Sequence, residues 1–166
     1  MTVAFYNKTL VSDSEVSQQI LTLTAALIDK IIQTVRDNNL LDLPEHIDVV
    51  LLSTLDEGVA AQADVDQALI EVDPAQPPNV LVESIIHELI HLEQGFIGWL
   101  KGSDEPFGMI WFDKFFDMPV TDEEYYAVPW ERDAWRRTPE IVREYKRCLK
   151  DSAGTSVASY AKRTLH

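Results

Sequence analysis

Two histidines and a glutamate stand close together in an otherwise apolar stretch of the chain. The sequence His87-Glu88-Leu89-Ile90-His91 separates the histidines by four positions. In an α-helix such residues lie about 40° apart around the axis, so both imidazoles can reach one metal ion. Neutral imidazole nitrogens one turn apart suit a tetrahedral zinc site. Glu88 is expected beside the metal, as the general base acting on a zinc-activated water.

The bland interpretation of this motif is a pair of histidines that only fill a core. The motif lies in a helix expected from Asn79 to about Gly95, and apolar residues cover most of its circumference. Such a pattern indicates a buried helix. Two imidazoles and a carboxylate are costly to bury without a partner. The sequence therefore favours a metal site over core histidines.

A catalytic zinc needs a third protein ligand. The two other histidines, His46 before a predicted strand and His166 at the chain end, are poorly placed. The third ligand is therefore expected to be a carboxylate, and Glu131, in a helix begun by Pro129, is the best candidate. The alternative for Glu131 is a solvated acid near a helix N-terminus. Asp133 is the next candidate for the ligand, or a partner that fixes one imidazole.

The second half of the pattern reads Tyr-x-x-x-Pro-x-Glu-x-Asp-Ala from Tyr125 to Ala134. Together with the histidine motif it resembles the minimal zincin-like metallopeptidases common in bacteriophage and prophage genomes. The resemblance covers about residues 47–137 and implies a small helix-plus-sheet unit that hydrolyses protein or peptide substrates with Zn²⁺. It implies that His87, His91 and Glu131 bind the zinc and that Glu88 is the base. It also implies a contact of Tyr125 or Tyr126 with the transition state.

An aromatic segment, Phe96 to Val120, separates the two halves of the pattern, and its residues 107–112 form a possible edge strand. In an active peptidase this segment should border an open cleft, and its edge strand should pair with an extended substrate. In a structural protein the same aromatic side chains should pack over the metal or into a subunit interface.

The surrounding elements predict an α+β fold in one domain, residues 1–166. The chain is expected to begin with a helix from Ser12 to about Asn38, followed by strands at Ile47–Leu52 and Ala68–Val72 with a loop at Asp56–Gly58 between them. The motif helix comes next. Three further helices are expected to begin near Thr121, at Pro129 and at Pro139, and the last one to end near Lys150.

Composition excludes several classes of function. The net charge of −14 argues against broad nucleic-acid binding, although the charge is uneven: −19 through Glu131 and +5 from Arg132 onward. The basic C-terminal part is interpreted first as a solvated helix face. A single cysteine, Cys148, excludes an intrachain disulfide. No apolar run is long enough for a membrane span, and no secretory signal is recognised, so a cytoplasmic location, or a virion if phage-encoded, is expected.

The sequence thus predicts a zinc-dependent metallopeptidase. The alternative is a phage-type structural or regulatory protein that retains a zincin zinc site without turnover, because a metal site alone does not define a substrate. A third, weaker possibility is a zinc hydrolase that acts on a non-peptide bond. The sequence indicates neither the oligomeric state nor the identity of the substrate.

Overall fold

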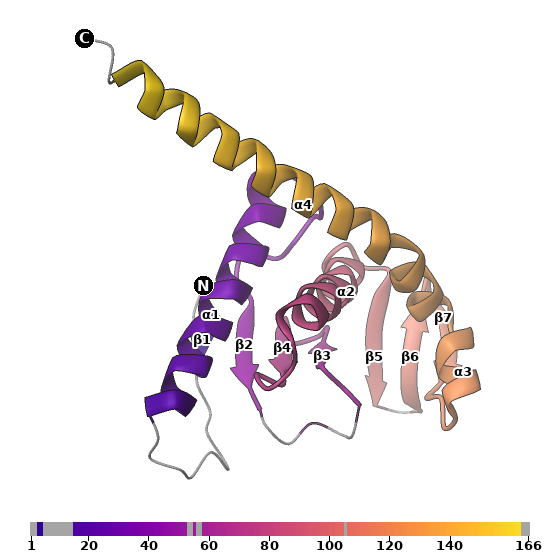
Figure 1. Ribbon diagram of the computed structural model, residues 1–166. Helices are drawn as coiled ribbons and strands as arrows, with labels where there is room; N and C mark the ends of the chain where they lie inside the picture. The colour runs from indigo at the N-terminus through magenta and orange to yellow at the C-terminus, as the bar shows by residue number, and fades with distance from the viewer. Residues whose placement is uncertain (1–2, 5–14, 53–54, 56–57, 105, 164–166) are drawn as a thin grey trace.

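The computed structural model describes residues 3–4, 15–52, 55, 58–104 and 106–163 of the 166-residue chain (Figure 1). This part of the chain is α+β, as predicted. Its helices are α1 (Glu15–Asp37), α2 (Pro78–Phe96), α3 (Asp122–Ala127) and α4 (Pro129–Arg163), and its strands form two small sheets. Among the described residues, no helix is long and apolar enough to cross a membrane.

The first sheet has four strands in the order β1 (Val3–Ala4), β2 (Asp48–Leu51), β4 (Leu69–Val72) and β3 (Ala61–Asp64). β1, β2 and β4 are parallel, whereas β3 runs antiparallel to β4 and forms an edge of the sheet. β2 and β4 confirm the two predicted strands. Of the loop expected between them, Asp56 and Glu57 lie outside the described residues.

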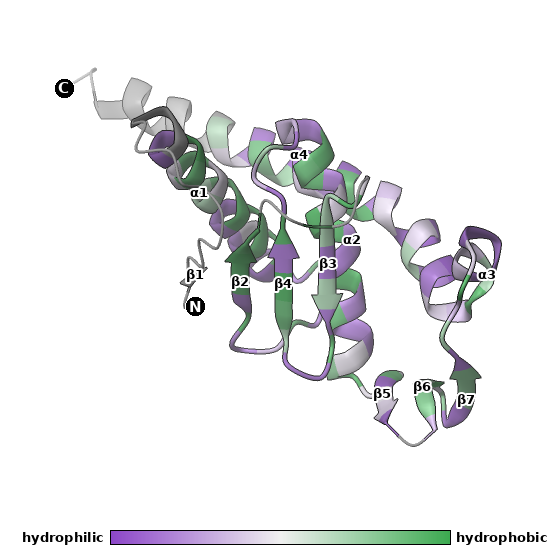
Figure 2. Cartoon of the chain, turned by 90° about the horizontal axis from the view of Figure 1, so that it is seen from below, coloured by the Kyte–Doolittle hydropathy of each residue, from purple (hydrophilic) through white to green (hydrophobic). Residues whose placement is uncertain are grey.

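α1, α2 and α4 lie on one face of this sheet (Figure 2). Alternate residues of the two central strands, Val49 and Leu51 in β2 and Ile70 and Val72 in β4, are buried. This period of two is that of a strand with one face against a core. α2 packs on β3 and β4 and is itself covered by α1 and α4, so α2 lies at the centre of the molecule.

α1 confirms the first predicted helix. Ile28, Ile31, Ile32 and Val35 recur at helical spacing and are fully buried. The helix ends at Asp37, close to the predicted end near Asn38, and Asn39 adopts a positive φ of 50° that only some residue types tolerate well. The predicted start at Ser12 lies outside the described residues.

The second sheet is an antiparallel meander of β5 (Leu100–Asp104), β6 (Phe107–Trp111) and β7 (Lys114–Asp117). It lies apart from the first sheet, next to α3 (Figure 1). Trp99, Trp111 and Phe112 contact one another with ring centroids 4.9–6.1 Å apart. The aromatic residues of this segment thus stabilise a local sheet of their own.

The C-terminal helices begin as predicted but do not all end as predicted. Thr121 and Glu124 form a capping box at the start of α3, and α4 begins at Pro129. The predicted restart at Pro139 is wrong, because α4 continues through this residue to Arg163. Burial of the flanking turns, at Ala134 and Val142, offsets the missing backbone hydrogen bond of a proline inside a helix.

Candidate metal centre

α2 carries the histidine motif, of which His87 and Glu88 line a cleft. His87, Glu88 and His91 are only 5%, 8% and 5% exposed, although all three side chains are ionisable. The apolar residues around them explain this burial, because Ile85, Ile86, Leu89, Ile90 and Leu92 anchor the helix on both sides in the core. The helix therefore holds the polar groups in place, whatever their own preference for water.

Glu131 reaches the same point from the first turn of α4. The residue is buried, with 4% exposure, so the solvated-acid interpretation is wrong. The neighbouring Ala134 is fully buried where α4 packs on α2. A small side chain there lets the two helices approach closely, which brings Glu131 within reach of the imidazoles.

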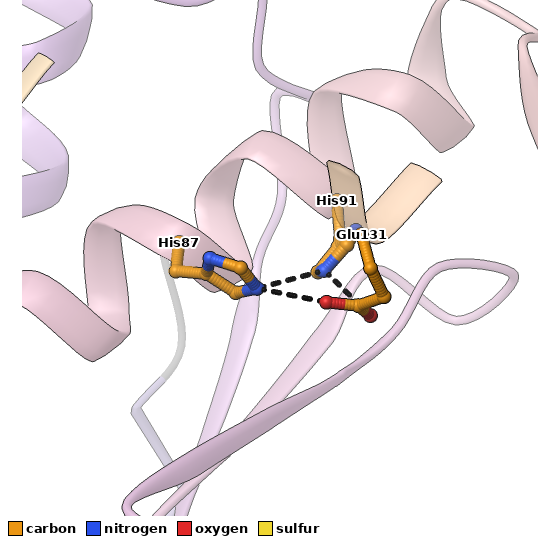
Figure 3. Close-up of side chains that lie close together, drawn as sticks. All are labelled: His87, His91 and Glu131. Atoms are coloured by element: carbon orange, nitrogen blue, oxygen red, sulfur yellow. Dashed lines mark hydrogen bonds and ion pairs between the residues drawn. The ribbon is translucent and has the colours of Figure 1, made fainter. Parts of the chain in front are cut away.

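The three side chains converge on one point (Figure 3). The Nε2 atoms of His87 and His91 lie 3.2 Å apart. One carboxylate oxygen of Glu131 lies 3.2 Å from the His87 Nε2, and the other lies 3.2 Å from the His91 Nε2. Two ligand atoms about 2.0–2.1 Å from a tetrahedral zinc would be about 3.3–3.4 Å apart. The spacing in the protein is therefore that of three ligands around one small metal ion.

Hydrogen bonds on the far side of each imidazole fix its tautomer. Gln94 donates its two amide N–H groups to the Trp130 carbonyl and to Asp133. Its Oε1, 2.9 Å from the His91 Nδ1, therefore accepts a hydrogen bond from the N–H of that ring. The Thr138 hydroxyl donates to the Ala134 carbonyl at 2.8 Å, so it accepts from the His87 Nδ1 at 3.3 Å. Both Nε2 atoms then carry lone pairs toward Glu131.

This donor set fits a metal ion. Two nitrogen lone pairs and a carboxylate face one another in a buried space, and such acceptors repel unless a cation lies between them. A proton supplies that charge in the metal-free protein. Burial on its own lowers the pKa of His91, but the hydrogen bond to Glu131 and the charges of Glu88 and Glu131 raise it above its ordinary value.

Glu131 is the strongest acid of this group. Burial would raise its pKa, but the hydrogen bonds and charges of His87 and His91 prevail and lower the pKa to about 2. The carboxylate thus stays ionised over the whole physiological range, which is the form that a metal requires of this ligand.

Asp133 is not a ligand. Its carboxylate accepts hydrogen bonds from Gln94, Arg136 and Arg137. Arg137 also pairs with Glu93, whose carboxylate accepts the Asp42 backbone N–H at 2.7 Å. Asp133 therefore orients an imidazole only indirectly, because it binds Gln94 and Gln94 binds the ring of His91.

Glu88 lies beside the three ligands and does not belong to them. Burial, and to a smaller extent the Glu131 charge, raise the pKa of Glu88 from 4.5 to about 8, although His91 and a hydrogen bond from the Ala63 backbone act in the opposite direction. The Ala63 contact is informative because Ala63 belongs to edge strand β3. The carboxyl group thus stands between the ligand cluster and an open strand edge.

Tyr125 and Tyr126 lie in α3, above the ligands, and are 39% and 57% exposed. Burial, the Glu131 charge and a hydrogen bond to that carboxylate raise the pKa of Tyr125, so its hydroxyl keeps its proton and can donate it. The Tyr126 ring instead lies 6.0 Å from the ring of Trp135, which in turn packs on His87 at 4.6 Å. The structure thus directs Tyr125, of the two predicted tyrosines, toward the ligands.

A cleft of about 800 Å³ opens over His87 and Glu88. Residues from four segments line it, namely Gly58–Ala61 before and in β3, Val80–Glu88 of α2, Asp122–Tyr126 of α3 and Trp135–Val142 of α4. None of the described residues of the aromatic segment Phe96–Val120 lines it, so the prediction that this segment borders the cleft is wrong. The strand that does border the cleft is β3, which carries no aromatic residue.

Several residues of the site were not recognised in the sequence. Gln94 stands three positions after His91 on the same helix, and Thr138 stands seven positions, about two turns, after Glu131 on the same face of α4. Helical spacing from the predicted ligands was therefore a usable signal. The Glu93–Arg137 pair had no such signal, because it joins different helices.

Comparisons of the chain with protein-family models, with curated proteins and with solved structures give no significant match. The chemistry of the site is therefore inferred from the residues of this chain.

Proposed function

We propose that the protein is a zinc-dependent metallopeptidase of the zincin type, with His87, His91 and Glu131 as zinc ligands. The observation that carries the proposal is the triangle of the three ligand side chains: the Nε2 atoms of His87 and His91 lie 3.2 Å apart, and each lies 3.2 Å from one of the two carboxylate oxygens of Glu131. His87 and the neighbouring Glu88 line an open cleft. Two imidazoles and one carboxylate are a ligand set of catalytic zinc, which leaves a position for a substrate or water.

When bound, zinc supplies a Lewis acid that polarises the scissile carbonyl and makes a water molecule more acidic. Glu88 must be ionised to act as a base, and the positive charge of a bound metal ion would lower its raised pKa. The carboxylate would then take the proton of the attacking water and deliver it to the leaving amine as the C–N bond of the peptide breaks. Its position outside the ligand triangle leaves the carboxyl group free for this transfer.

Tyr125 and β3 position the substrate. The Tyr125 hydroxyl remains protonated and faces the ligands, so it can donate a hydrogen bond to the oxygen that becomes negatively charged during attack. Among the described residues β3 pairs only with β4, and the cleft is lined by its first residue, Ala61, and by Ala60 just before the strand. An extended peptide can add to the edge of such a strand by backbone hydrogen bonds.

The test combines metal content with turnover. We expect about one zinc per chain by mass spectrometry of the native protein, and cleavage of a diverse peptide library by the zinc-loaded protein. Glu88→Gln should keep the zinc and lose a factor of roughly 10²–10⁴ in rate, because the amide cannot take the proton. Equal cleavage by both proteins would refute Glu88 as the base. Absence of zinc in the native protein and no uptake on titration would refute the metal site.

One observation favours the second candidate, a structural or regulatory protein that retains the zinc site. All three ligand residues are at most 5% exposed, as in a site that only stabilises a fold. That function requires zinc-dependent stability without cleavage of any peptide in the library. The open cleft over Glu88 favours the enzyme, since a structural zinc has no use for a base.

A further inference from the structure

The cleft continues into a second hollow on the outer side of α4. This groove of about 470 Å³ is lined by Pro139, Val142, Arg143, Lys146, Arg147 and Lys150. Pro139 and Val142 also line the cleft over Glu88. The two hollows therefore share a wall, and a chain that leaves the cleft along α4 enters the groove.

The groove is positively charged. Four of its six lining residues are cationic. Arg147 is partly neutralised by Glu144 at 2.6 Å and Asp151 at 3.9 Å on the same helix. Within the part of the chain that the structure describes, Arg143, Lys146 and Lys150 take part in no ion pair. Three cations without a partner in one groove stand out on a chain whose net charge is −14.

The spacing along α4 relates this charge to the candidate site. Thr138 contacts His87, so it marks the position of the ligands on α4. Arg143 and Lys150 follow five and twelve residues later, which places them about 8 and 18 Å farther along the helix. An extended peptide advances about 3.3 Å per residue. If a peptide lies along α4 with its cleaved bond at the ligands, the cations therefore lie beside the peptide residues about two to six positions from that bond.

We propose that this groove is the part of the substrate site that selects acidic peptide segments, about two to six residues to one side of the cleaved bond. The proposal rests on the proposed function for the reaction itself. The apolar walls from Pro139 and Val142 suit a peptide backbone and side-chain stems, while the cations attract Asp and Glu. A nucleic acid fits less well, because the body of the protein carries a charge of −19 through Glu131.

The test uses charge reversal in the groove. In Arg143→Glu/Lys146→Glu both substitutions lie outside the residues that hold or face the ligands. The matched control is Lys101→Glu/Lys114→Glu, which makes the same change in net charge on the three-stranded sheet, whose residues line neither hollow. Equal zinc content and melting temperature among the three proteins show that each variant is folded.

The peptides cleaved from a library by the zinc-loaded protein should be enriched in Asp and Glu two to six positions from the cut, on one side. On an acidic peptide, the groove variant should raise KM roughly tenfold with kcat unchanged. On a neutral peptide of equal length, the KM of the groove variant should stay within about twofold of the native value. The control variant should have the native KM on both the acidic and the neutral peptide. The preference should shrink as salt rises, because salt screens exposed charges. Cleavage without any acidic preference, or an equal loss in the control, would overturn the proposal.

Binding separates this proposal from the proposed function. A fluorescein-labelled acidic 12-residue peptide should bind the Glu88→Gln protein, by anisotropy, more tightly than its lysine counterpart, and the added groove reversal should abolish the difference. Such binding without any cleavage by the native protein would refute the peptidase and keep the acidic groove. Tighter binding of a single-stranded DNA of equal charge at physiological salt would overturn the assignment to peptides.

Discussion

The two halves of α4 place their polar side chains in opposite environments. From Glu131 to Thr138 the helix lies against α2, and Glu131, Asp133, Arg137 and Thr138 each have defined partners in the site. From Arg143 to Lys150 the cationic side chains face an open groove. One part of the helix thus holds side chains in fixed positions at the candidate site, and another part presents charged side chains that can adjust to a ligand. Catalysis requires the first property and selection of a substrate the second. Substitutions in the two halves should therefore differ in kind. The charge reversal described above tests the cationic half, and four predictions test the fixed geometry around the ligands, from the largest expected effect to the smallest.

Glu131→Ala should weaken zinc binding by far more than a hundredfold and remove turnover with it, because it deletes a ligand, and loss of an outer partner alone costs about 10–100-fold. Competition with a chromophoric chelator measures the affinity. Glu140→Ala, an exposed acid two and a half turns along the same helix, is the control and should change nothing. Zinc binding of native strength in Glu131→Ala would show that the carboxylate is not a ligand.

Gln94→Ala should weaken zinc binding by about 10–100-fold, because His91 loses the acceptor that holds its Nδ1 proton and ring orientation. The same titration checks it, and Gln33→Ala on the exposed face of α1 serves as the control. If Gln94→Ala binds zinc as the native protein does, the hydrogen-bonded network around His91 does not support the site.

Tyr125→Phe should lower kcat by roughly tenfold and leave KM and zinc content near their native values, since its hydroxyl is expected to act on the transition state. Tyr126→Phe should have little effect, because only its ring contacts Trp135. Steady-state kinetics on one cleaved peptide separates the two. A larger loss of kcat in Tyr126→Phe than in Tyr125→Phe would show that Tyr126, and not Tyr125, contacts the transition state.

The metal-free protein should be stabilised by Glu88→Gln, and more so at pH 8 than at pH 5. The pKa of Glu88 is raised from 4.5 to about 8 in the folded state, so unfolding releases a proton between these pH values. The native protein therefore loses stability as pH rises through this window, whereas glutamine has no proton to release. Urea denaturation at both pH values, with a chelator present, measures the difference. A gain that is constant with pH would contradict the raised pKa.

Much of the site could be predicted from sequence because helices translate spacing into geometry. His87 and His91 had to share a face once they lay in one helix, and the shortage of other histidines left a carboxylate as the third ligand. The choice between Glu131 and Asp133 was harder. The two residues are 200° apart around α4, and the packing of Ala134 on α2 decides which one faces the imidazoles.

The parts that could not be predicted depend on contacts between distant segments. Aromatic residues such as Trp99, Trp111 and Phe112 suit either a cleft or a core, and only the pairing of β5 with β6 brings these three together at one end of a separate sheet. β3 could not be predicted either, because Ala61–Asp64 shows no apolar strand pattern and forms a strand only through its pairing with β4. Local propensity is a weak guide where burial is decided elsewhere.

Pro139 gives α4 a mechanical property that its two halves do not have separately. A proline inside a helix has no N–H to donate to the carbonyl four residues earlier, here that of Trp135, whose ring packs on His87. Bending therefore disrupts one bond fewer at this turn than at any other turn of the helix between Glu131 and Lys150. Pro139 also belongs to the wall shared by cleft and groove. Thermal bending of α4 is thus expected to pivot at this wall, so that the cationic half can move with a bound peptide while Glu131 keeps its position. Faster amide hydrogen exchange at residues 136–138 and 140 than in the adjoining turns would reveal the pivot.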